Sequence, residues 1–156
     1  MTNISTREAT RADINHIAEF QQAMALETES RTLDAATLKQ GISAVFDAPQ
    51  KGCYIVADVN ADGEGAAQVA GSLLITYEWS DWNNATYYWI QSVYVDSAWR
   101  GKGVYRALYE HVLSVATKRG DSCGIRLYVE RTNTIAQQAY TSLGMHKSPY
   151  DLYEKR

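Results

Sequence analysis

The sequence has 156 residues, of which 46% are hydrophobic and 21% are charged, and its formal net charge at pH 7 is −3. These values predict one soluble globular domain over residues 1-156, and without a basic run or basic face they argue against nucleic acid as the main partner. No apolar run approaches the ~18 residues that a membrane span needs, and the first residues lack the form of a signal peptide, so we expect a cytoplasmic protein with no membrane partner.

The N-terminal part of the sequence predicts a strand followed by two helices. Residues 3–7 are expected to form the strand. Asp13 is a candidate cap for the first helix, whose apolar residues recur at helical spacing. A second helix is expected to start at Leu33 and Asp34 and to end before Pro49, because proline cannot continue a helix.

The connection between these helices carries two carboxylates, Glu27 and Glu29. They can be ordinary solvated surface charge, or they can face a positively charged ligand. The sequence alone leaves both interpretations open.

Two strands are expected next, over residues 54–59 and 68–78, with a turn between them at residues 60–65. The second strand leads into a loop at residues 78–84. This loop contains two tryptophans and two carboxylates, Glu78, Trp79, Asp81 and Trp82. Exposed aromatic side chains are costly at a hairpin tip, so we expect the tryptophans to pack on the domain or on a bound ligand.

The most informative stretch follows, over residues 89–116. Residues 89–95 are β-branched, aromatic and apolar, which predicts a strand buried on both faces. A glycine-rich turn with the sequence RGKG follows at residues 100–103. From Val104 onward, apolar residues recur at near-helical spacing, so the turn leads directly into a helix.

This turn is a candidate anion site. Gly101 and Gly103 let the backbone turn tightly and approach a ligand closely. The first N–H groups of the helix have no intrahelical partner, and the helix dipole adds partial positive charge there. Arg100, Lys102 and Arg106 add full positive charge, so a pyrophosphate group is the expected ligand. The turn does not match the GxxxxGK[ST] loop, and the dinucleotide motif GxGxxG would need glycine in place of Arg106.

The C-terminal part predicts a strand, a helix and a last strand. Residues 123–130 alternate apolar and polar side chains, as a strand does. Thr132 or Asn133 is expected to cap the helix, and Gly144 is expected to end it in the left-handed conformation. Residues 150–153 are expected to close the sheet.

Two segments resemble the GNAT superfamily of N-acetyltransferases. Residues 100–105, RGKGVY, are similar to the acyl-coenzyme-A loop [Q/R]xxGx[G/A] at its first and fourth positions, and Tyr105 departs from the small residue at its sixth position. Residues 133–145, from Asn133 to Met145, resemble the NxxAxxxYxxxGF element, with methionine in place of phenylalanine. Together the two segments cover about residues 89–146.

This resemblance implies a fold, a reaction and a co-substrate. The fold would be α/β (α+β), with a mixed and bent central β-sheet flanked by about four helices. The reaction would be acetyl transfer from acetyl-CoA directly to an amine in a ternary complex, with no metal. The implied coenzyme contacts are Val93, Val95, Arg100, Gly101, Lys102, Gly103, Val104, Tyr105, Arg106, Asn133 and Tyr140.

The resemblance also implies roles for single side chains. Tyr140 would protonate the departing thiolate, although it could instead be a packing residue at the core edge. Asn133 could be only a helix cap. Many relatives carry a glutamate on the central strand where this chain has Gln91, which cannot take a proton. An alkyl amine with a pKa near ~10.4 is protonated at neutral pH, so a base or a water chain is needed.

Three carboxylates are candidates for that base. Glu78 is the first candidate, Asp81 the second and Glu27 the third. We expect these carboxylates and Glu29 to lie at one end of the cleft, which favours a small cationic amine as the acceptor. The expected acceptor contacts are Glu27, Glu29, Trp79, Asp81 and Gln91.

Two other functions remain open at this stage. The acceptor could be a protein N-terminus or a lysine side chain. The chain could also be an acyl-CoA-binding sensor without catalysis, which Tyr105 and Gln91 would favour. The sequence does not decide whether the chain forms a homodimer.

Overall fold

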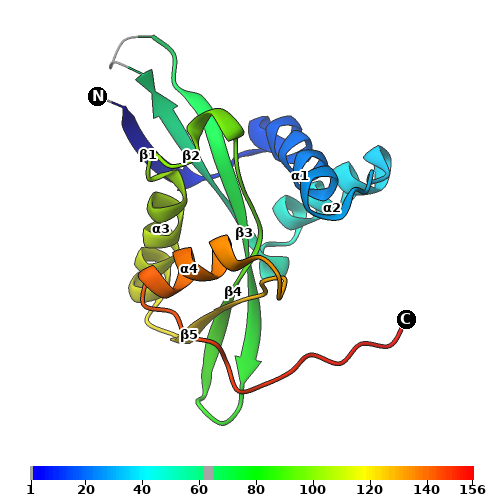
Figure 1. Cartoon of the computed structure of the whole chain (residues 1–156). Coiled ribbons are helices and arrows are strands. Elements are labelled where there is room, and N and C mark those ends of the chain that lie inside the picture. Colours follow the sequence, from blue (N-terminus) through cyan, green and yellow to red (C-terminus); the bar gives the residue numbers. More distant parts are fainter. Residues whose placement is uncertain (1, 62–64) are drawn as a thin grey trace.

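The computed structural model describes residues 2–61 and 65–156 (Figure 1), so the turn predicted at residues 60–65 lies partly outside the described residues. The strands within this part are β1 (Asn3–Glu8), β2 (Cys53–Asn60), β3 (Gln68–Ser80), β4 (Ala85–Val95) and β5 (Ser122–Leu127). The α-helices are α1 (Ile14–Glu29), α2 (Ala35–Asp47), α3 (Val104–Arg119) and α4 (Thr134–Ser142), and the short 3-10 helices are η1 (Arg11–Asp13), η2 (Pro49–Lys51) and η4 (Ser97–Trp99).

The strands form one mixed sheet in the order β1-β2-β3-β4-β5. Neighbouring strands from β1 to β4 are antiparallel, and β4 and β5 are parallel. Parallel neighbours need a crossover connection, and α3 provides it (Figure 1). The mixed, curled sheet with its helices confirms the fold expected from the sequence.

Two separate apolar cores cover the two faces of the sheet. On one face, α3 buries Val104, Leu108 and Val112 against the strands. On the other face, α1 and α2 bury Ile17 and Ile42. The spacing of Val104, Leu108 and Val112 predicts an apolar stripe on α3, because residues three and four apart share one face of a helix. Among the described residues, no helix is long and apolar enough to cross a membrane.

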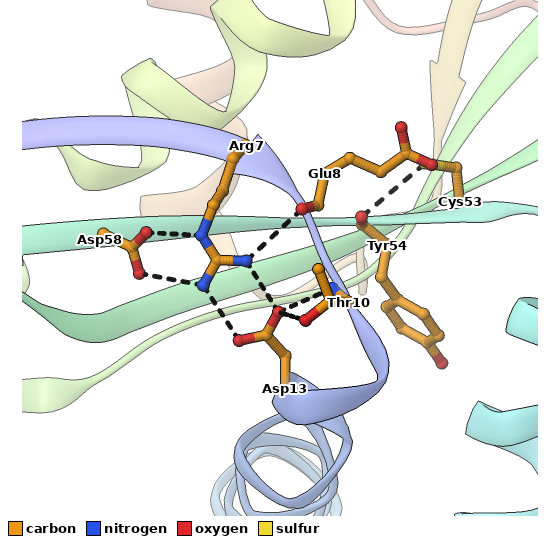
Figure 2. Close-up of polar contacts among 7 residues, drawn as sticks. All are labelled: Arg7, Glu8, Thr10, Asp13, Cys53, Tyr54 and Asp58. Carbon is orange, nitrogen blue, oxygen red and sulfur yellow. Dashed lines mark hydrogen bonds and ion pairs between the residues drawn. The ribbon is translucent and has the colours of Figure 1, made fainter.

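An ionic network joins β1, β2 and the start of α1 (Figure 2). The Arg7 guanidinium donates to Asp13 at 2.8 and 3.0 Å and to Asp58 at 2.7 Å. The hydrogen bonds from Arg7 are the main cause that lowers the pKa of Asp13. Asp13 precedes α1 as predicted, but its carboxylate makes no cap hydrogen bond to the helix. It accepts instead from Arg7 and from the Thr10 N–H, because a buried carboxylate is best satisfied by a cation.

Three expectations about the strands are wrong. The strand expected at residues 123–130 is β5, which ends at Leu127. The hairpin between β3 and β4 is tighter than predicted, because β3 continues to Ser80 and β4 already begins at Ala85. Residues 150–153 form no strand, so β5 is the last strand of the sheet. Pro149 lacks a backbone N–H for a ladder, and the Leu152 and Tyr153 side chains are exposed.

Candidate functional site

The edge of the sheet formed by β4 and β5 splits partway along its length. The two strands pair from Thr86 with Ser122 to Ile90 with Leu127. There β5 ends, whereas β4 continues beside β3 to Val95. Among the described strands, none pairs with the outer side of β4 beyond this point, so the strands open into a wedge.

A β-bulge lies in β4 where the strands part. Ser72 of β3 pairs with Tyr94 and Leu74 pairs with Gln91, so β4 has one more residue than β3 in this interval. Ser92 lies in the bulge with a φ of 50°, in the left-handed region that few non-glycine residues adopt. Such a residue costs about 1–3 kcal/mol and often marks a functional site.

A cavity of about 140 Å³ lies in the wedge. Its walls come from β4, from the first turn of α3 and from α4. They are formed by Val93, Tyr94, Val95, Tyr105, Ala136, Ala139 and Tyr140. The mostly apolar lining and the position beside an unpaired strand suit an extended chain that carries amide groups.

The backbone of β4 beyond the bulge directs polar groups into this wedge. The Asp96 N–H donates to the Ala70 carbonyl of β3 at 2.8 Å. Residues two apart in a strand direct their N–H and C=O groups the same way, so Tyr94 also points to β3. The backbone N–H and C=O groups of Val93 and Val95 therefore point away from β3, to the side where β5 has ended, and a ligand amide can pair with them there.

The glycine turn places the start of α3 at one end of the wedge. Gly101 and Gly103 have φ angles of 74° and 91°, and α3 begins directly afterwards at Val104. Both angles lie in the region that favours glycine. The first N–H groups of an α-helix have no intrahelical partner, and the binding of an anion by this turn stays a prediction.

The cations of the turn already have partners within the protein. Arg100 donates to the Val95 carbonyl at 2.9 Å and to Glu27 at 2.8 Å, and its guanidinium lies 5.2 Å from the Tyr94 ring centroid. Lys102 donates to the Ala98 carbonyl at 3.1 Å. Arg100 therefore ties the end of β4 to the C-terminal end of α1, a role that the sequence did not indicate.

The predicted residues of α4 lie on the opposite wall. Tyr140 lines the cavity. Burial raises its pKa, and the Tyr105 hydroxyl opposes that shift. Asn133 caps α4, because its side-chain oxygen accepts from the Ala136 N–H at 3.1 Å. This contact supports the helix-cap interpretation of Asn133 and leaves its side-chain amide group as a donor.

The structure does not bring the four candidate carboxylates together. Glu27 lies at the Val95 end of β4, where Tyr94 and Arg100 hold it, and hydrogen bonding from Arg100 is the main cause that lowers the pKa of Glu27. Glu78 is paired across the sheet with Tyr87, toward the other end of β4. The expectation that they converge on one end of the cleft is therefore wrong, because Glu27 sits beside the basic turn.

The tryptophans of the β3–β4 hairpin do not pack on the domain. The exposed fractions of Trp79 and Trp82 are 63% and 93%, and Asp81 is also exposed. Glu29, another predicted acceptor contact, also lies on the surface, 4.0 Å from Arg31 at the exposed end of α1. The expectation that the tryptophans pack on the domain is thus wrong for the described residues. Contact with a bound molecule stays a prediction.

Sequence reasoning missed a platform of aromatic and charged side chains beside the wedge, which we call the β4–β5 platform. Its members are Glu78, Tyr87, Trp89, Arg126 and Tyr128. Arg126 donates to Glu78 at 2.6 Å and lies 3.5 Å from the Tyr87 ring centroid. The Trp89 and Tyr128 rings lie 4.5 Å apart. The alternation predicted at residues 123–130 could have found it, because Arg126 and Tyr128 alternate with residues that face α3.

Gln91 lies on β4 between the platform and the bulge. Its side-chain amide donates weakly to the Thr76 hydroxyl at 3.4 Å. In the part of the chain that the structure describes, no group of three or more His, Cys, Asp or Glu residues could hold a metal ion.

Comparisons with known proteins agree with this geometry. The model of the Acetyltransferase (GNAT) family matches residues 14–145. The crystal structure of a possible acetyltransferase from Clostridium difficile 630 is 38% identical, with 98% of this chain and 97% of that chain covered and a TM-score of 0.87. No curated protein matches the chain.

More distant structures share the fold alone. A transcriptional regulator from Bacillus halodurans C-125 is 19% identical, with 99% of this chain and 100% of that chain covered and a TM-score of 0.80. A glucosamine-6-phosphate N-acetyltransferase from Arabidopsis thaliana is 15% identical, with 98% of both chains covered and a TM-score of 0.70. At these identities the likeness carries no information about the acceptor.

Proposed function

This chain belongs to the GNAT acetyltransferase family, and we propose that it transfers the acetyl group of acetyl-CoA directly to a primary amine, with a small cationic amine as the acceptor. The family assignment favours an enzyme over a sensor that only binds acyl-CoA. The observation that carries the proposal is the wedge between β4 and β5, with helix amides at one end and Tyr140 on its wall.

The residues of the wedge fit acetyl-CoA. The amides of the first turn of α3, with Gly101 and Gly103 before them, would hold the pyrophosphate, and Lys102 and Arg106 would add charge. The backbone of Val93 and Val95 would pair with the pantetheine amides. When bound, acetyl-CoA supplies an activated thioester.

Three needs of acetyl transfer can be assigned to groups at the bulge, on the cavity wall and on the β4–β5 platform. N–H groups of β4 at the bulge can stabilise the oxygen of the tetrahedral intermediate. Tyr140 can give its hydroxyl proton to the departing sulfur. The acceptor amine must lose a proton, and we propose that water passes it to Glu78.

Water is needed because Glu78 is far from the bulge. Glu78 pairs with Tyr87, which is four residues before Gln91 on β4. At about 3.3 Å per residue, these positions lie roughly 13 Å apart along the strand. Each proton transfer requires about 2.6–3.2 Å between heavy atoms, so a chain of several waters would have to bridge this distance.

The β4–β5 platform favours a cationic acceptor. Glu78 offers a carboxylate, and the Trp89 and Tyr128 rings offer faces that attract cations. Arg126 neutralises part of that charge, so the acceptor would compete with Arg126 for Glu78. Protein N-termini and lysine side chains are the alternative acceptors, since they also present an amine.

Steady-state release of coenzyme A tests this proposal. The acceptor panel should contain diamines, polyamines, aminoglycosides, lysine peptides and a phosphorylated amino sugar, the class named for the Arabidopsis structure. We expect kcat/KM to be highest for small cationic amines. If only the phosphorylated sugar were acetylated, a cationic acceptor would be contradicted. If none of the amines in the panel were acetylated, the proposed reaction would be contradicted.

A further inference from the structure

Tyr105 occupies the position where the family loop prefers a small residue, and its side chain lines the wedge cavity. It is the second residue of α3 and faces Tyr140 of α4. Their ring centroids lie 5.7 Å apart, with an angle of 50° between the ring planes. The two phenols thus come from different helices and meet at one cavity.

The hydroxyl of Tyr105 has an unusual surrounding. Its oxygen is buried, and it has no hydrogen-bond partner among the described residues. Buried polar groups are nearly always paired, so an unpaired one in a cavity calls for an explanation. The phenol of Tyr140, the proposed acid, lies across the same cavity.

We propose that Tyr105 is a positioning residue for Tyr140: its unpaired hydroxyl turns to donate a hydrogen bond to the Tyr140 oxygen when that oxygen becomes charged, and so stabilises the phenolate that forms as acetyl transfer ends. This inference rests on the proposed function, because it needs Tyr140 to act as the acid. It assigns a use to the residue by which this chain departs from the family loop.

The proton balance of the step is simple. As the tetrahedral intermediate collapses, the carbon–sulfur bond breaks and the sulfur takes the electron pair. The Tyr140 O–H bond breaks, and a sulfur–hydrogen bond forms. The negative charge stays on the Tyr140 oxygen, and Tyr105 keeps its own proton. Glu78 then returns, through water, the proton that it took from the acceptor amine, and this proton restores the hydroxyl of Tyr140.

The surroundings explain why Tyr105 donates and Tyr140 is the acid. Burial raises the pKa of Tyr105 strongly, with a smaller rise from Tyr140, so Tyr105 stays protonated. Burial also raises the pKa of Tyr140, but the Tyr105 hydroxyl lowers it. The other ionisable side chains at the pair are the phenols of Tyr94 and Tyr109.

The test compares Tyr105→Phe with Tyr109→Phe as a matched control, since Tyr109 is a buried phenol one turn along α3. Loss of one hydrogen bond to a developing charge should lower kcat by about 10- to 100-fold. The KM for acetyl-CoA should change less than about 3-fold, and the Tyr109→Phe rate should be unchanged. On the Tyr140→Phe background, Tyr105→Phe should have no further effect, since its hydrogen bond then has no phenolate to stabilise.

A second measurement needs no turnover. The free protein is titrated with base, and the absorbance of tyrosinate is followed. The ionisation that is missing in Tyr140→Phe belongs to the Tyr140 phenol. In Tyr105→Phe this ionisation should occur at a higher pH than in the wild type. The linkage sign is that a lost hydrogen bond to the phenolate raises its pKa.

Three results would overturn the inference. One is an unchanged kcat in Tyr105→Phe with chemistry rate-limiting, and another is a raised KM for acetyl-CoA alone, which would make Tyr105 only a wall of the cavity. The third is an unchanged tyrosinate titration. If the wild type transfers acetyl groups but Tyr140→Phe retains its rate, this inference fails while the proposed function stands. If the wild type transfers no acetyl groups, the proposed function fails, and the tyrosinate titration still tests the hydrogen bond from Tyr105 to the ionised Tyr140.

Discussion

Arg100 has two roles that compete for one side chain. Its place in the loop predicts contact with the coenzyme, yet its guanidinium is bound to Glu27 and to the Val95 carbonyl. Glu27 lies 73 residues away in sequence. No local pattern could have paired the two, because the contact depends on how α1 docks on the sheet.

This contact changes the expected effect of Glu27→Gln on coenzyme binding. Removing the carboxylate frees Arg100 to reach the phosphates. Arg100 and Glu27 are each nearly half exposed, so the pair contributes only about 0–1 kcal/mol. Acetyl-CoA should therefore bind up to about 5-fold more tightly, as measured by calorimetry.

Glu29→Gln is the matched control, because Glu29 is also exposed on α1 and is 4.0 Å from its nearest cation. Its affinity for acetyl-CoA should equal that of the wild type. Weaker binding in Glu27→Gln would mean that the Glu27–Arg100 pair organises the coenzyme site and does not compete with it.

Lys102 gives a second prediction at the residue scale. It lies in the turn before α3, over the Trp99 ring at 4.8 Å. A ligand that binds only the folded state at 100 times its Kd stabilises the protein by about 2.7 kcal/mol. Lys102→Glu should remove much of the rise in Tm that acetyl-CoA causes, because it places a negative charge beside the pyrophosphate.

Lys118→Glu provides the control, since Lys118 lies in the last turn of the same helix. It should keep the wild-type shift in Tm. An equal shift in Lys102→Glu and the wild type would place the phosphates away from this turn.

At the scale of elements, α3 tests the apolar stripe predicted from helical spacing. Leu108 is fully buried against the sheet, whereas Leu113 on the same helix is 41% exposed. Leu108→Ala should lower the free energy of unfolding by about 2–5 kcal/mol, through lost burial and the cavity left behind. Leu113→Ala should cost far less, and urea denaturation of both variants measures the difference. Similar losses would mean that α3 does not dock through this face.

The elements that the sequence predicts well are those that local rules determine. The turn before α3 is one, because two glycines with positive φ and a helix start are required together. The cap of α4 by Asn133 is another. The helical stripes follow from spacing alone.

The elements that it predicts poorly depend on distant partners. The run at residues 150–153 resembles a strand, but no described strand lies beside it. The β4–β5 platform needs residues from three strands, and the bulge at Ser92 shows only in the register of β3 and β4. Strand pairing over long sequence separations is therefore the information that local patterns lack.

At the scale of the whole molecule, the Arg7 network joins three segments of the chain, at residues 7, 13 and 58. It links β1 to β2 and both to the start of α1 (Figure 2). The Asp13 side chain is 7% exposed, whereas that of Arg7 is 41% exposed. The network therefore fixes α1 against the sheet, and α1 in turn carries Glu27 to the end of β4.

Asp13 makes the stability of the molecule depend on pH. Hydrogen bonding from Arg7 lowers its pKa in the folded state, so the folded state binds fewer protons than the unfolded state near the ordinary aspartate pKa of about 4. Its contribution is thus fully present above pH ~4 and is lost as the pH falls through the folded-state pKa. Asp13→Asn should lower the free energy of unfolding by about 1–3 kcal/mol at pH 7.

The difference between wild type and Asp13→Asn should shrink as the pH falls from 5 toward ~2, because wild-type Asp13 is then protonated too. Urea denaturation across this range measures it. Asp47→Asn is the control, since Asp47 pairs with Arg11 at 2.6 Å while both side chains are more than half exposed, and its loss should stay near 0–1 kcal/mol. A gap between wild type and Asp13→Asn that stayed constant with pH would show that Asp13 acts through packing, and that its charge does not hold α1 to the sheet.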